Sequence, residues 1–548
     1  MKKIISIITL VILAVACTDR FEAVNRNPYR VSEASLIQDY NFGVRFTTLF
    51  QNLTAGQTGE DPTTDTYVRH VGTPTDFLNN RNNTTYYIDD GWNAEMWNRI
   101  YNNNMSPGNV IKNSSYEQGL TLYAAWVELF QVSGLSRLTV YHGPLIYSDY
   151  ASEDKSTYFY DSERELYEQF FAKLDKIYDE FKANLPTGNK ETDANLQTIA
   201  AKFDPTYSGD LKKWLKYINS LRLRLAMRIV KADPGWAQRE GEKAIKDLQG
   251  LIITTTDNFK TSLYSGRHQI VTFNHNWNDS RMGAEMESVL LGYNDPRLER
   301  WFEPVSDAFY EMYPDYNFPV PSKPYKGIAS GSYIVAKDHR VPYSKVSNAY
   351  FNQTGNGGQH RRFLTAAEVN FILAEAALRN WDVPKSAKEY YEDGVKESFK
   401  EWEVTGVDAY LADDTSLPIN YEDPKDSKNN FDTRWTLTIK WDDAETNPEV
   451  HLERIMNQKW LDAFLNANEV WSDHRRTGYP KLHYNPKNDS GSGPWGTIAD
   501  NDFLKRMPFV LNERNNNREG VADAAAKLGS GGDQITTRLW IHPAGPNF

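Results

Sequence analysis

The 548-residue chain contains one cysteine, Cys17, so no disulfide can form within it. Beyond the first 16 residues, no segment reaches the roughly 20 apolar residues that a membrane-spanning helix needs. The formal net charge is −12, and no run of lysine and arginine carries interleaved aromatic residues. These absences exclude a disulfide-stapled fold and a bundle of membrane helices, and they argue against nucleic acid as a partner.

Signatures of common enzymes are also lacking. The sequence has no HExxH, no GxSxG and no phosphate-binding loop, which disfavours the main hydrolase and nucleotide-using classes. A glycoside hydrolase needs only two carboxyl groups about 5 to 10 Å apart beside a sugar platform, so spacing along the chain does not exclude it. We therefore expect a protein without catalytic activity, with a glycoside hydrolase as the less favoured alternative.

The chain begins with an export signal, MKKIISIITLVILAVAC. Lys2 and Lys3 precede an apolar stretch, and the small Ala16 lies just before Cys17. Cys17 matches the lipidated cysteine of bacterial lipoproteins, although the usual leucine three positions earlier is replaced by Ala14. We expect residues 1–16 to be a signal peptide, residues 17–35 a lipidated cysteine with a flexible tether, and residues 36–548 a single body. The alternative is an ordinary signal peptide that leaves an idle thiol.

Helical periodicity dominates the remaining sequence. Apolar residues recur at steps of three and four over 211–229, where Asp210 is the expected N-cap and Pro234 the expected stop. Thr365 and Glu368 have capping-box spacing at the start of a helix over 365–381, and 386–402 is expected to form its antiparallel partner. Further helices are expected over 95–111, 116–138, 162–184 and 451–466. Sequential helix pairs indicate a mainly α solenoid, but no fixed repeat period identifies its type.

Four segments lack this periodicity and combine Asn, Gly, Pro and aromatic residues: 74–92, 254–281, 310–360 and 403–450. We expect them to be long irregular loops with a few short strands. Functional residues on a rigid scaffold tend to lie in such loops.

Several motifs, in order along nearly the whole chain, carry a resemblance to a known family. They are the signal with Cys17, DPTYSGDLKKWLKYINSLRLRLAMRI (204–229), LGYNDPRLERWFEP (291–304), TAAEVNFILAEAALRNW (365–381), ERIMNQKWLDAFLNANEVWSDHRRTGYPKL (453–482), RMPFVLNERNNN (506–517) and TRLWIHP near the end. Together they resemble the SusD/RagB family of nutrient-binding lipoproteins.

The resemblance implies a mainly α fold in which a tetratricopeptide-like helical-repeat scaffold holds a more irregular ligand-binding half. It also implies a lipid anchor in the outer membrane, exposure at the cell surface, and a SusC-like TonB-dependent transporter as partner, to which captured glycans would pass. Ligand residues in this family lie in variable loops, so none can be carried over through a matching motif.

Candidate ligand residues come instead from loop composition. The chain holds 15 Trp, 32 Tyr and 25 Phe, a load that fits either exposed stacking surfaces or aromatic-rich helix interfaces. Sugar faces stack on aromatic rings while amides and carboxylates bind the hydroxyls. Two loops supply this mixture, and their candidate residues are Phe77, Arg81, Tyr86 and Tyr87 in DFLNNRNNTTYY and Asn276, Trp277 and Asp279 in TFNHNWNDSR.

Two alternatives to a glycan site at these loops stay open. Peptides would suit the same surfaces, and a protein partner could bind through the helical scaffold. The ring of Trp277 could also fold back to pin its own loop.

Charged residues within apolar helices have a structural interpretation. An unpaired buried charge is costly, so we expect Arg222, Arg224 and Glu375 to form buried ion pairs. Arg475 and Arg476 could clamp an anion, but at a helix end we favour carbonyl capping and ion pairing.

No cofactor is expected. The acidic loop from Asp413 to Asn430 could hold calcium, but it lacks the oxygen spacing of an EF-hand, and a solvated loop is the favoured interpretation. His268 and His275 are expected to be surface residues rather than metal ligands.

Overall fold

The computed structural model describes residues 48–49, 52–53, 56–117, 119–152, 155–188, 204–262, 268–315, 324–334, 342–352, 358 and 360–548. The expected signal peptide, Cys17 and the tether lie outside these residues. Within them, no helix is long and apolar enough to cross a membrane.

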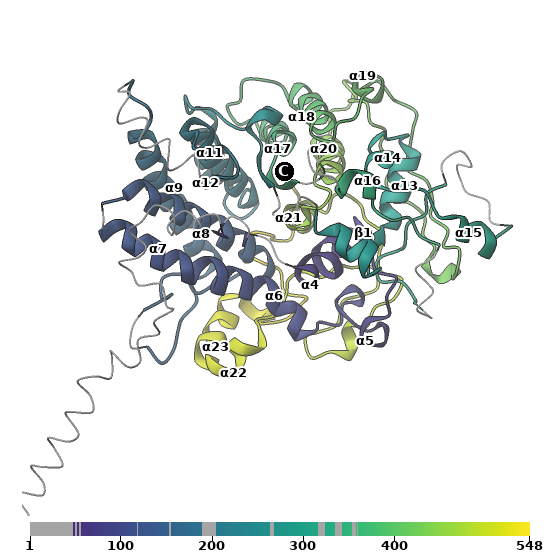
Figure 1. Cartoon of the computed structure of the whole chain (residues 1–548), viewed down its shortest axis with the longest axis horizontal. Helices are drawn as coiled ribbons and strands as arrows, with labels where there is room; N and C mark the ends of the chain where they lie inside the picture. The colour runs from purple at the N-terminus through teal and green to yellow at the C-terminus, as the bar shows by residue number, and fades with distance from the viewer. Residues whose placement is uncertain are drawn as a thin grey trace, which may run out of the picture.

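A first group of helices fills the left of Figure 1. Consecutive members pack together, α7 against α8, α8 against α9, α9 against α11 and α11 against α12. Their bounds are α6 (Asp90–Ile100), the π-helical η4 (Tyr101–Met105), α7 (Ser106–Glu117), α8 (Thr121–His142), α9 (Glu163–Ala183), α11 (Leu211–Arg228) and α12 (Pro234–Ile245). The expected helices over 95–111, 162–184 and 211–229 are thereby confirmed. The one expected over 116–138 begins later, at Thr121, because α7 ends at Glu117.

A second group lies at the top and centre of Figure 1. Helix α17 packs against both α18 and α20, and α11 contacts α17, which joins the two groups. The bounds are α17 (Ala366–Leu378), α18 (Ala387–Glu401), α20 (Pro448–Asp462) and α21 (Ala467–Thr477). The expected antiparallel pair over 365–402 is therefore present. The expected helix over 451–466 is present as α20 but ends earlier, at Asp462.

Side-chain caps begin these helices where the sequence indicated. Asp210 accepts hydrogen bonds from the main-chain N–H groups of Lys212 and Lys213 at the start of α11. Thr365 caps α17 through the N–H of Glu368, but the Glu368 carboxylate pairs with Arg224 instead of closing a capping box. Pro234 does not end α11, which stops at Arg228; it opens α12, where its missing N–H and fixed φ suit the first turn.

The rest of the chain is irregular, with short helices at the right and bottom of Figure 1. Among the described residues there are two antiparallel sheets of two strands each: β1 (Val71–Gly72) with β3 (Arg281–Met282), and β2 (Phe259–Ser262) with β4 (His360–Leu364). The expectation of irregular segments with a few short strands is confirmed.

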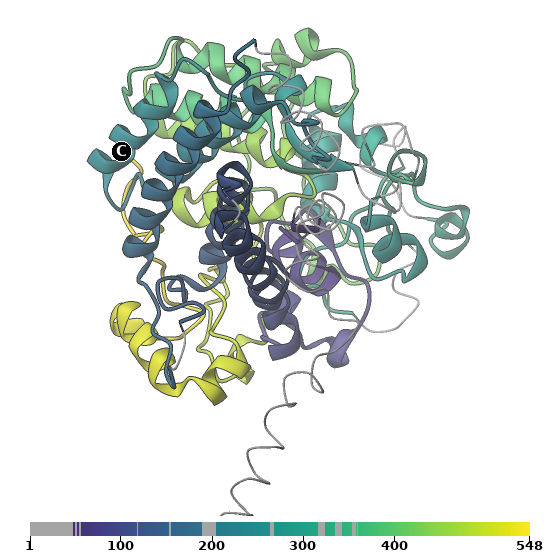
Figure 2. The ribbon, with the colours of Figure 1, turned by 60° about the vertical axis from the view of Figure 1, so that its left-hand side comes forward.

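The short helices of this irregular part differ in type. The α-helices are α4 (Gln57–Gly59), α5 (Phe77–Asn80), α13 (Ala284–Gly292), α14 (Arg297–Trp301), α15 (Asp307–Met312), α16 (Asn348–Phe351), α19 (Val407–Leu411), α22 (Leu511–Asn516) and α23 (Arg518–Lys527). The others are η2 (Glu60–Asp65), η3 (Asn83–Thr85), η5 (Thr255–Asp257), η6 (Thr272–Asn276), η9 (Ser427–Asn429), η10 (Ser490–Ser492) and η11 (Gly529–Gly531). In the turned view of Figure 2, α22 and α23 lie at the lower edge and α18 and α20 at the top.

Aromatic side chains account for much of the core. One contiguous cluster of buried apolar residues runs from Leu49 to Ile541. Its fully buried members include Trp126, Trp214, Trp301, Trp402, Trp435, Trp460 and Trp471. Many of the aromatic residues therefore pack at helix interfaces and do not form a binding surface.

The charged residues inside helices form the expected ion pairs. Arg222 pairs with Asp175 and Glu240, and Arg224 pairs with Glu368 at 2.6 Å. Glu375, fully buried, accepts from Arg476 at 2.6 Å and from Arg379 at 2.8 Å. Burial alone raises the pKa of the Glu375 carboxyl, but the two guanidinium groups outweigh it and lower the pKa to about 2. These residues hold the scaffold together.

Candidate functional site

The short sheet β1–β3 brings together two loops that lie about 200 residues apart in sequence. Val71 pairs with Met282 and Gly72 with Arg281, so the segment after β1 and the segment before β3 leave the sheet side by side. Gly72 permits this arrangement, because a Cβ atom there would lie 2.7 Å from the carbonyl oxygen of Ile328. Both loops that the sequence singled out therefore meet at one place, which we call the two-loop platform (residues 73–87 and 274–281).

Asp279 fastens the two loops to each other. Its carboxylate accepts hydrogen bonds from the Thr75 hydroxyl at 3.0 Å and from Gln57 Nε2 at 3.2 Å, and its carbonyl accepts from the Thr73 hydroxyl at 2.7 Å. Because these bonds occupy both carboxylate oxygens, the first role of Asp279 is to hold the platform in shape.

Trp277 is the most prominent ring of the platform. It follows η6, and 52% of its surface is exposed. The buried ring of Phe273 stacks against it, with centroids 5.5 Å apart and planes inclined by 29°. Asn276 beside it is exposed. Trp277 is therefore a supported ring that stays half-exposed. Its stacking on Phe273, four residues earlier, also helps to hold its own loop, as the alternative interpretation expected.

The other loop presents a second set of side chains. Phe77 is half-buried and meets the ring of Trp92 edge-on at 5.4 Å, while Leu78 is 52% exposed. The guanidinium of the exposed Arg81 lies 4.8 Å above the Tyr87 ring, which is partly exposed. Phe77, Arg81 and Tyr87 thus keep accessible surface, and their role as ligand residues stays a prediction.

Tyr86 differs from the expectation of an exposed residue. Only 3% of its surface is exposed, its hydroxyl accepts a hydrogen bond from Arg69 Nη2 at 3.4 Å, and its ring lies 6.2 Å from that of Tyr67. Because the ring is buried, a ligand cannot reach its faces, and Tyr86 instead packs beneath the surface of the loop and supports it. The sequence could not separate it from Tyr87, because neighbouring tyrosines in an irregular segment carry no periodicity.

Backbone strain is concentrated in the platform. Leu78, Asn79, Asn80, Tyr86 and Asn278 all have positive φ angles between 53° and 64°. This conformation is unfavourable for residues other than glycine and is found mostly at sites where the surrounding structure imposes it. Here Asn82 helps to impose it, since Nδ2 donates to the Phe77 carbonyl at 2.8 Å and Oδ1 accepts from the Thr84 N–H at 3.0 Å.

The two-loop platform carries the carboxylates of Asp76 and Asp279. Within the described residues, the carboxyl groups with a raised pKa are all buried, and burial is the main cause of each shift. They are Asp65 (about 7), Glu163 (about 7), Asp462 (about 6), Asp204 and Glu287. None of them lies in the two loops.

The acidic loop from Asp413 to Asn430 uses its carboxylates to hold turns. Asp413 accepts from the N–H groups of Thr415 and Ser416, each at 2.9 Å, and Asp423 accepts from that of Lys425 at 2.9 Å. No group of three or more His, Cys, Asp or Glu residues suited to a metal ion occurs in the described part of the chain.

The two histidines of the sequence analysis differ from each other. His268 is buried, not at the surface as expected, and burial followed by the charge of Arg362 lowers its pKa to about 3. His275 is partly exposed, and its Nε2 lies 2.8 Å from the Val346 carbonyl.

A pocket apart from the two-loop platform was not foreseen from the sequence. A pocket of about 480 Å³ lies between α6, η4 and α22, and it combines rings with amides. Its lining includes Trp97, Tyr101, Tyr150, Tyr158, Asn98, Asn102, Asn512 and Asn516. The sequence signal was the run of asparagines at 102–104 and 515–517, but those segments are about 400 residues apart and nothing local joins them.

Comparison with known proteins gives a consistent result. Residues 23–542 match the family model described as SusD-like, SusD and RagB outer membrane lipoprotein. A chitin-binding SusD homologue from Flavobacterium johnsoniae is 35% identical, with a TM-score of 0.82 over 92% of this chain and 100% of that one. A search of the curated proteins gives no match.

Two further solved structures are similar to the chain. A SusD homologue from Bacteroides vulgatus is 28% identical, with a TM-score of 0.81 over 93% of this chain and 100% of that one. A SusD-like protein from Bacteroides thetaiotaomicron is 28% identical, with a TM-score of 0.78 over 91% and 98%. These matches confirm the resemblance and the helical-repeat fold class that it implied.

Proposed function

Because the chain belongs to the SusD-like family of outer-membrane lipoproteins, we propose that it captures glycans on the two-loop platform and passes them to a SusC-like TonB-dependent transporter. One observation supports the platform most strongly: Trp277 is half-exposed on a backing ring, beside a loop that Asp279 holds in register. A preformed aromatic surface binds sugars without the entropic cost of ordering itself.

The glycan class that we propose is oligosaccharides of N-acetylglucosamine. The similar protein from F. johnsoniae is described as chitin-binding and is 35% identical over its full length. The side chains of the two loops suit this class. Asn276 offers an amide and Arg81 a charged donor for hydroxyl and acetamido oxygens, and the rings of Trp277 and Tyr87 offer faces on which sugars can stack.

Binding without catalysis fits the disposition of the carboxyl groups. Retaining and inverting glycosidases need an acid of raised pKa beside the bound sugar. The carboxyl groups with a raised pKa are buried and lie outside the two loops, and Asp279 is engaged by Thr75 and Gln57. We therefore propose that the protein releases its ligand unchanged.

Delivery requires a position beside the transporter. Cys17 remains our candidate for lipidation, and acyl chains on it would hold the body at the outer membrane through about 0.8 kcal/mol per buried methylene. We further propose that the body is exposed at the cell surface and that its partner is the SusC-like transporter.

Calorimetric titration of the protein lacking residues 1–17 tests this function. We expect saturable binding of N-acetylglucosamine oligomers that strengthens with chain length, and no new reducing ends on prolonged incubation. Matched titrations with short peptides are the control. Binding of peptides with no binding of any glycan in a broad panel would contradict the proposal, and release of shorter sugars would contradict its non-catalytic part.

A further inference from the structure

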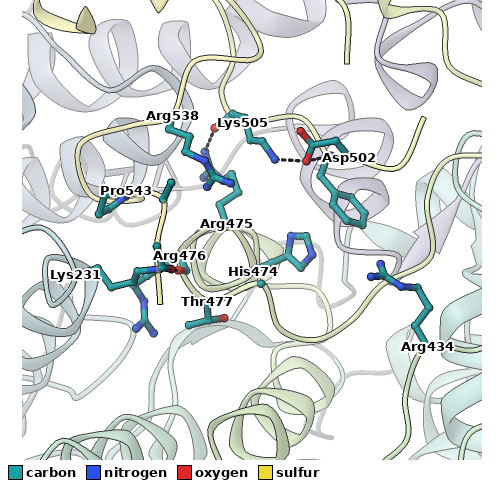
Figure 3. A pocket seen from close by; sticks show the side chains of 14 residues that line it. Lys231, Arg434, His474, Arg475, Arg476, Thr477, Asp502, Lys505, Arg538 and Pro543 are labelled. Atoms are coloured by element: carbon teal, nitrogen blue, oxygen red, sulfur yellow. Dashed lines mark hydrogen bonds and ion pairs between the residues drawn. The ribbon is translucent and has the colours of Figure 1, made fainter. Parts of the chain in front are cut away.

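A cationic pocket lies at the end of α21, and none of the platform residues line it (Figure 3). Its volume is about 270 Å³. Six cationic side chains contribute to its lining, together with one carboxylate, Asp502. The cations are Lys231, Arg434, Arg475, Arg476, Lys505 and Arg538. Such an excess of positive charge is unusual in a chain of net charge −12.

Two of the arginines are held by the scaffold. Arg475 donates to the carbonyls of Trp471, Lys505 and Val140 at 2.7 to 3.0 Å, which confirms the expected capping role. Arg476 pairs with Glu375 and with Asp473, as the sequence analysis also expected. They contribute charge to the pocket, but they have little capacity left to bind a ligand.

The remaining cations keep free donors. Arg538 is exposed and has no hydrogen-bond or ion-pair partner among the described residues. Arg434 donates once, to the Leu482 carbonyl at 2.8 Å, and lies 4.3 Å above the Tyr484 ring. Lys231 donates to the carbonyls of Arg476 and Gly545, and Lys505 pairs with Asp502. No carboxylate in the described part of the chain pairs with Arg434, Arg538 or Lys231.

The like charges repel one another. Burial, followed by the charges of Arg476 and Arg538, lowers the pKa of Lys231. The pKa of Lys505 is also lowered, mainly by burial and further by Arg538 and Arg475, although Asp502 opposes the shift. The carboxyl end of α21 compensates only about half a charge. An anion in the pocket would relieve this repulsion.

We propose that this pocket binds an oxyanion group, a sulfate or phosphate, either as an ester on a sugar or as the free ion. Guanidinium groups match the geometry of such oxygens and bind them through paired hydrogen bonds. The volume is below the range of about 300 to 1,000 Å³ of sites for drug-sized ligands, which suits one charged sugar unit rather than a chain. The site is separate from the platform and adds a second contact for charged ligands.

Calorimetric titration of the protein with sodium sulfate and sodium phosphate, at an ionic strength matched with sodium chloride, tests the proposal. We expect saturable binding with one site. Arg538→Gln should weaken it severalfold and Arg538→Gln with Arg434→Gln at least tenfold, because both side chains supply free donors. Asp502→Asn should tighten binding, since it removes the only carboxylate of the lining. Arg518→Gln, at an exposed arginine on α23, is the matched control and should change nothing.

A second pair of titrations distinguishes the source of the oxyanion. N-acetylglucosamine 6-sulfate binding more tightly than sulfate, with no pocket binding of neutral N-acetylglucosamine, identifies a sugar ester; equal affinities identify the free ion. The proposal is overturned if sulfate and phosphate show no saturable binding, or if the Arg538 and Arg434 variants bind as the control does. Circular dichroism and melting of each variant show that loss of binding does not reflect unfolding.

Discussion

Trp277 is a large ring that the fold leaves half-exposed, with Phe273 stacked behind it. Such a ring contributes little to folding and much to a ligand that covers it. The loss of this ring should therefore affect ligand binding rather than stability.

Trp277→Ala should weaken glycan binding about two- to tenfold, because one stacking contact contributes about 0.5 to 1.5 kcal/mol beyond its buried area. Its melting temperature should stay within a few degrees of the parent, since exposed substitutions change stability by about 0.5 kcal/mol or less. Titration calorimetry and thermal melts measure the two effects. Phe159→Ala, at a ring that is 43% exposed, is the matched control and should bind as the parent does. An unchanged affinity for Trp277→Ala would remove this ring from the site.

Asp279→Ala tests the fastening of the two loops. It removes the bonds to Thr75 and Gln57 but leaves Trp277 in place. We expect weaker glycan binding together with faster amide hydrogen exchange over residues 73–80, measured by mass spectrometry. Asp432→Ala, at an exposed carboxylate of another loop, should change neither. Weaker binding without faster exchange would instead make Asp279 a direct ligand contact.

Helices and their caps were predictable from the sequence, whereas the platform as a unit was not. The periodicity over α11 and the Asp210 cap depend only on residues close together in the sequence, so the sequence predicts both. The sheet β1–β3 has only two residues in each strand, and nothing local pairs Gly72 with Arg281. The loops could be singled out by composition, but their contact, the buried position of Tyr86 and the fastening by Asp279 depend on tertiary structure.

The contact between α17 and α21 depends on Glu375, which Arg476 and Arg379 hold ionised inside the scaffold. Glu375→Ala should lower the free energy of unfolding by about 3 to 5 kcal/mol, because the buried Arg476 then keeps only Asp473 as a partner and Arg379 loses the carboxylate with which it pairs. Urea unfolding at pH 7 measures this loss. Glu168→Ala, which breaks the exposed pair with Arg164, is the control and should have a much smaller effect.

The loss from Glu375→Ala should also depend on pH. The pKa of Glu375 is about 2 in the folded protein and 4.5 for the ordinary side chain, so its stabilisation is complete above pH 4.5 and is lost as the pH falls toward 2. The difference between parent and variant should therefore shrink as the pH falls below 4.5. An equal difference at pH 7 and pH 3.5, or an unchanged stability with lost ligand binding, would contradict the structural role.

The whole molecule combines a helical scaffold, an irregular part that carries the proposed glycan site, and an expected anchor ahead of the described residues. Replacing Cys17 with alanine tests the anchor. The variant should leave the membrane fraction and the detergent phase, whereas the parent should remain in both, because the acyl chains supply the membrane affinity. Fractionation of cells followed by immunoblotting measures the distribution. A variant that still partitions with detergent would show that Cys17 is not the lipidated residue.

The central claim is that glycans bind where the two loops meet, and a crystal structure with a bound N-acetylglucosamine oligomer tests it most directly. We predict a sugar ring stacked on Trp277, with further contacts to Asn276, Arg81 and the Tyr87 ring. An oligomer that leaves Trp277 exposed and lies instead in the hollow lined by Trp97 and Tyr150 would contradict the account.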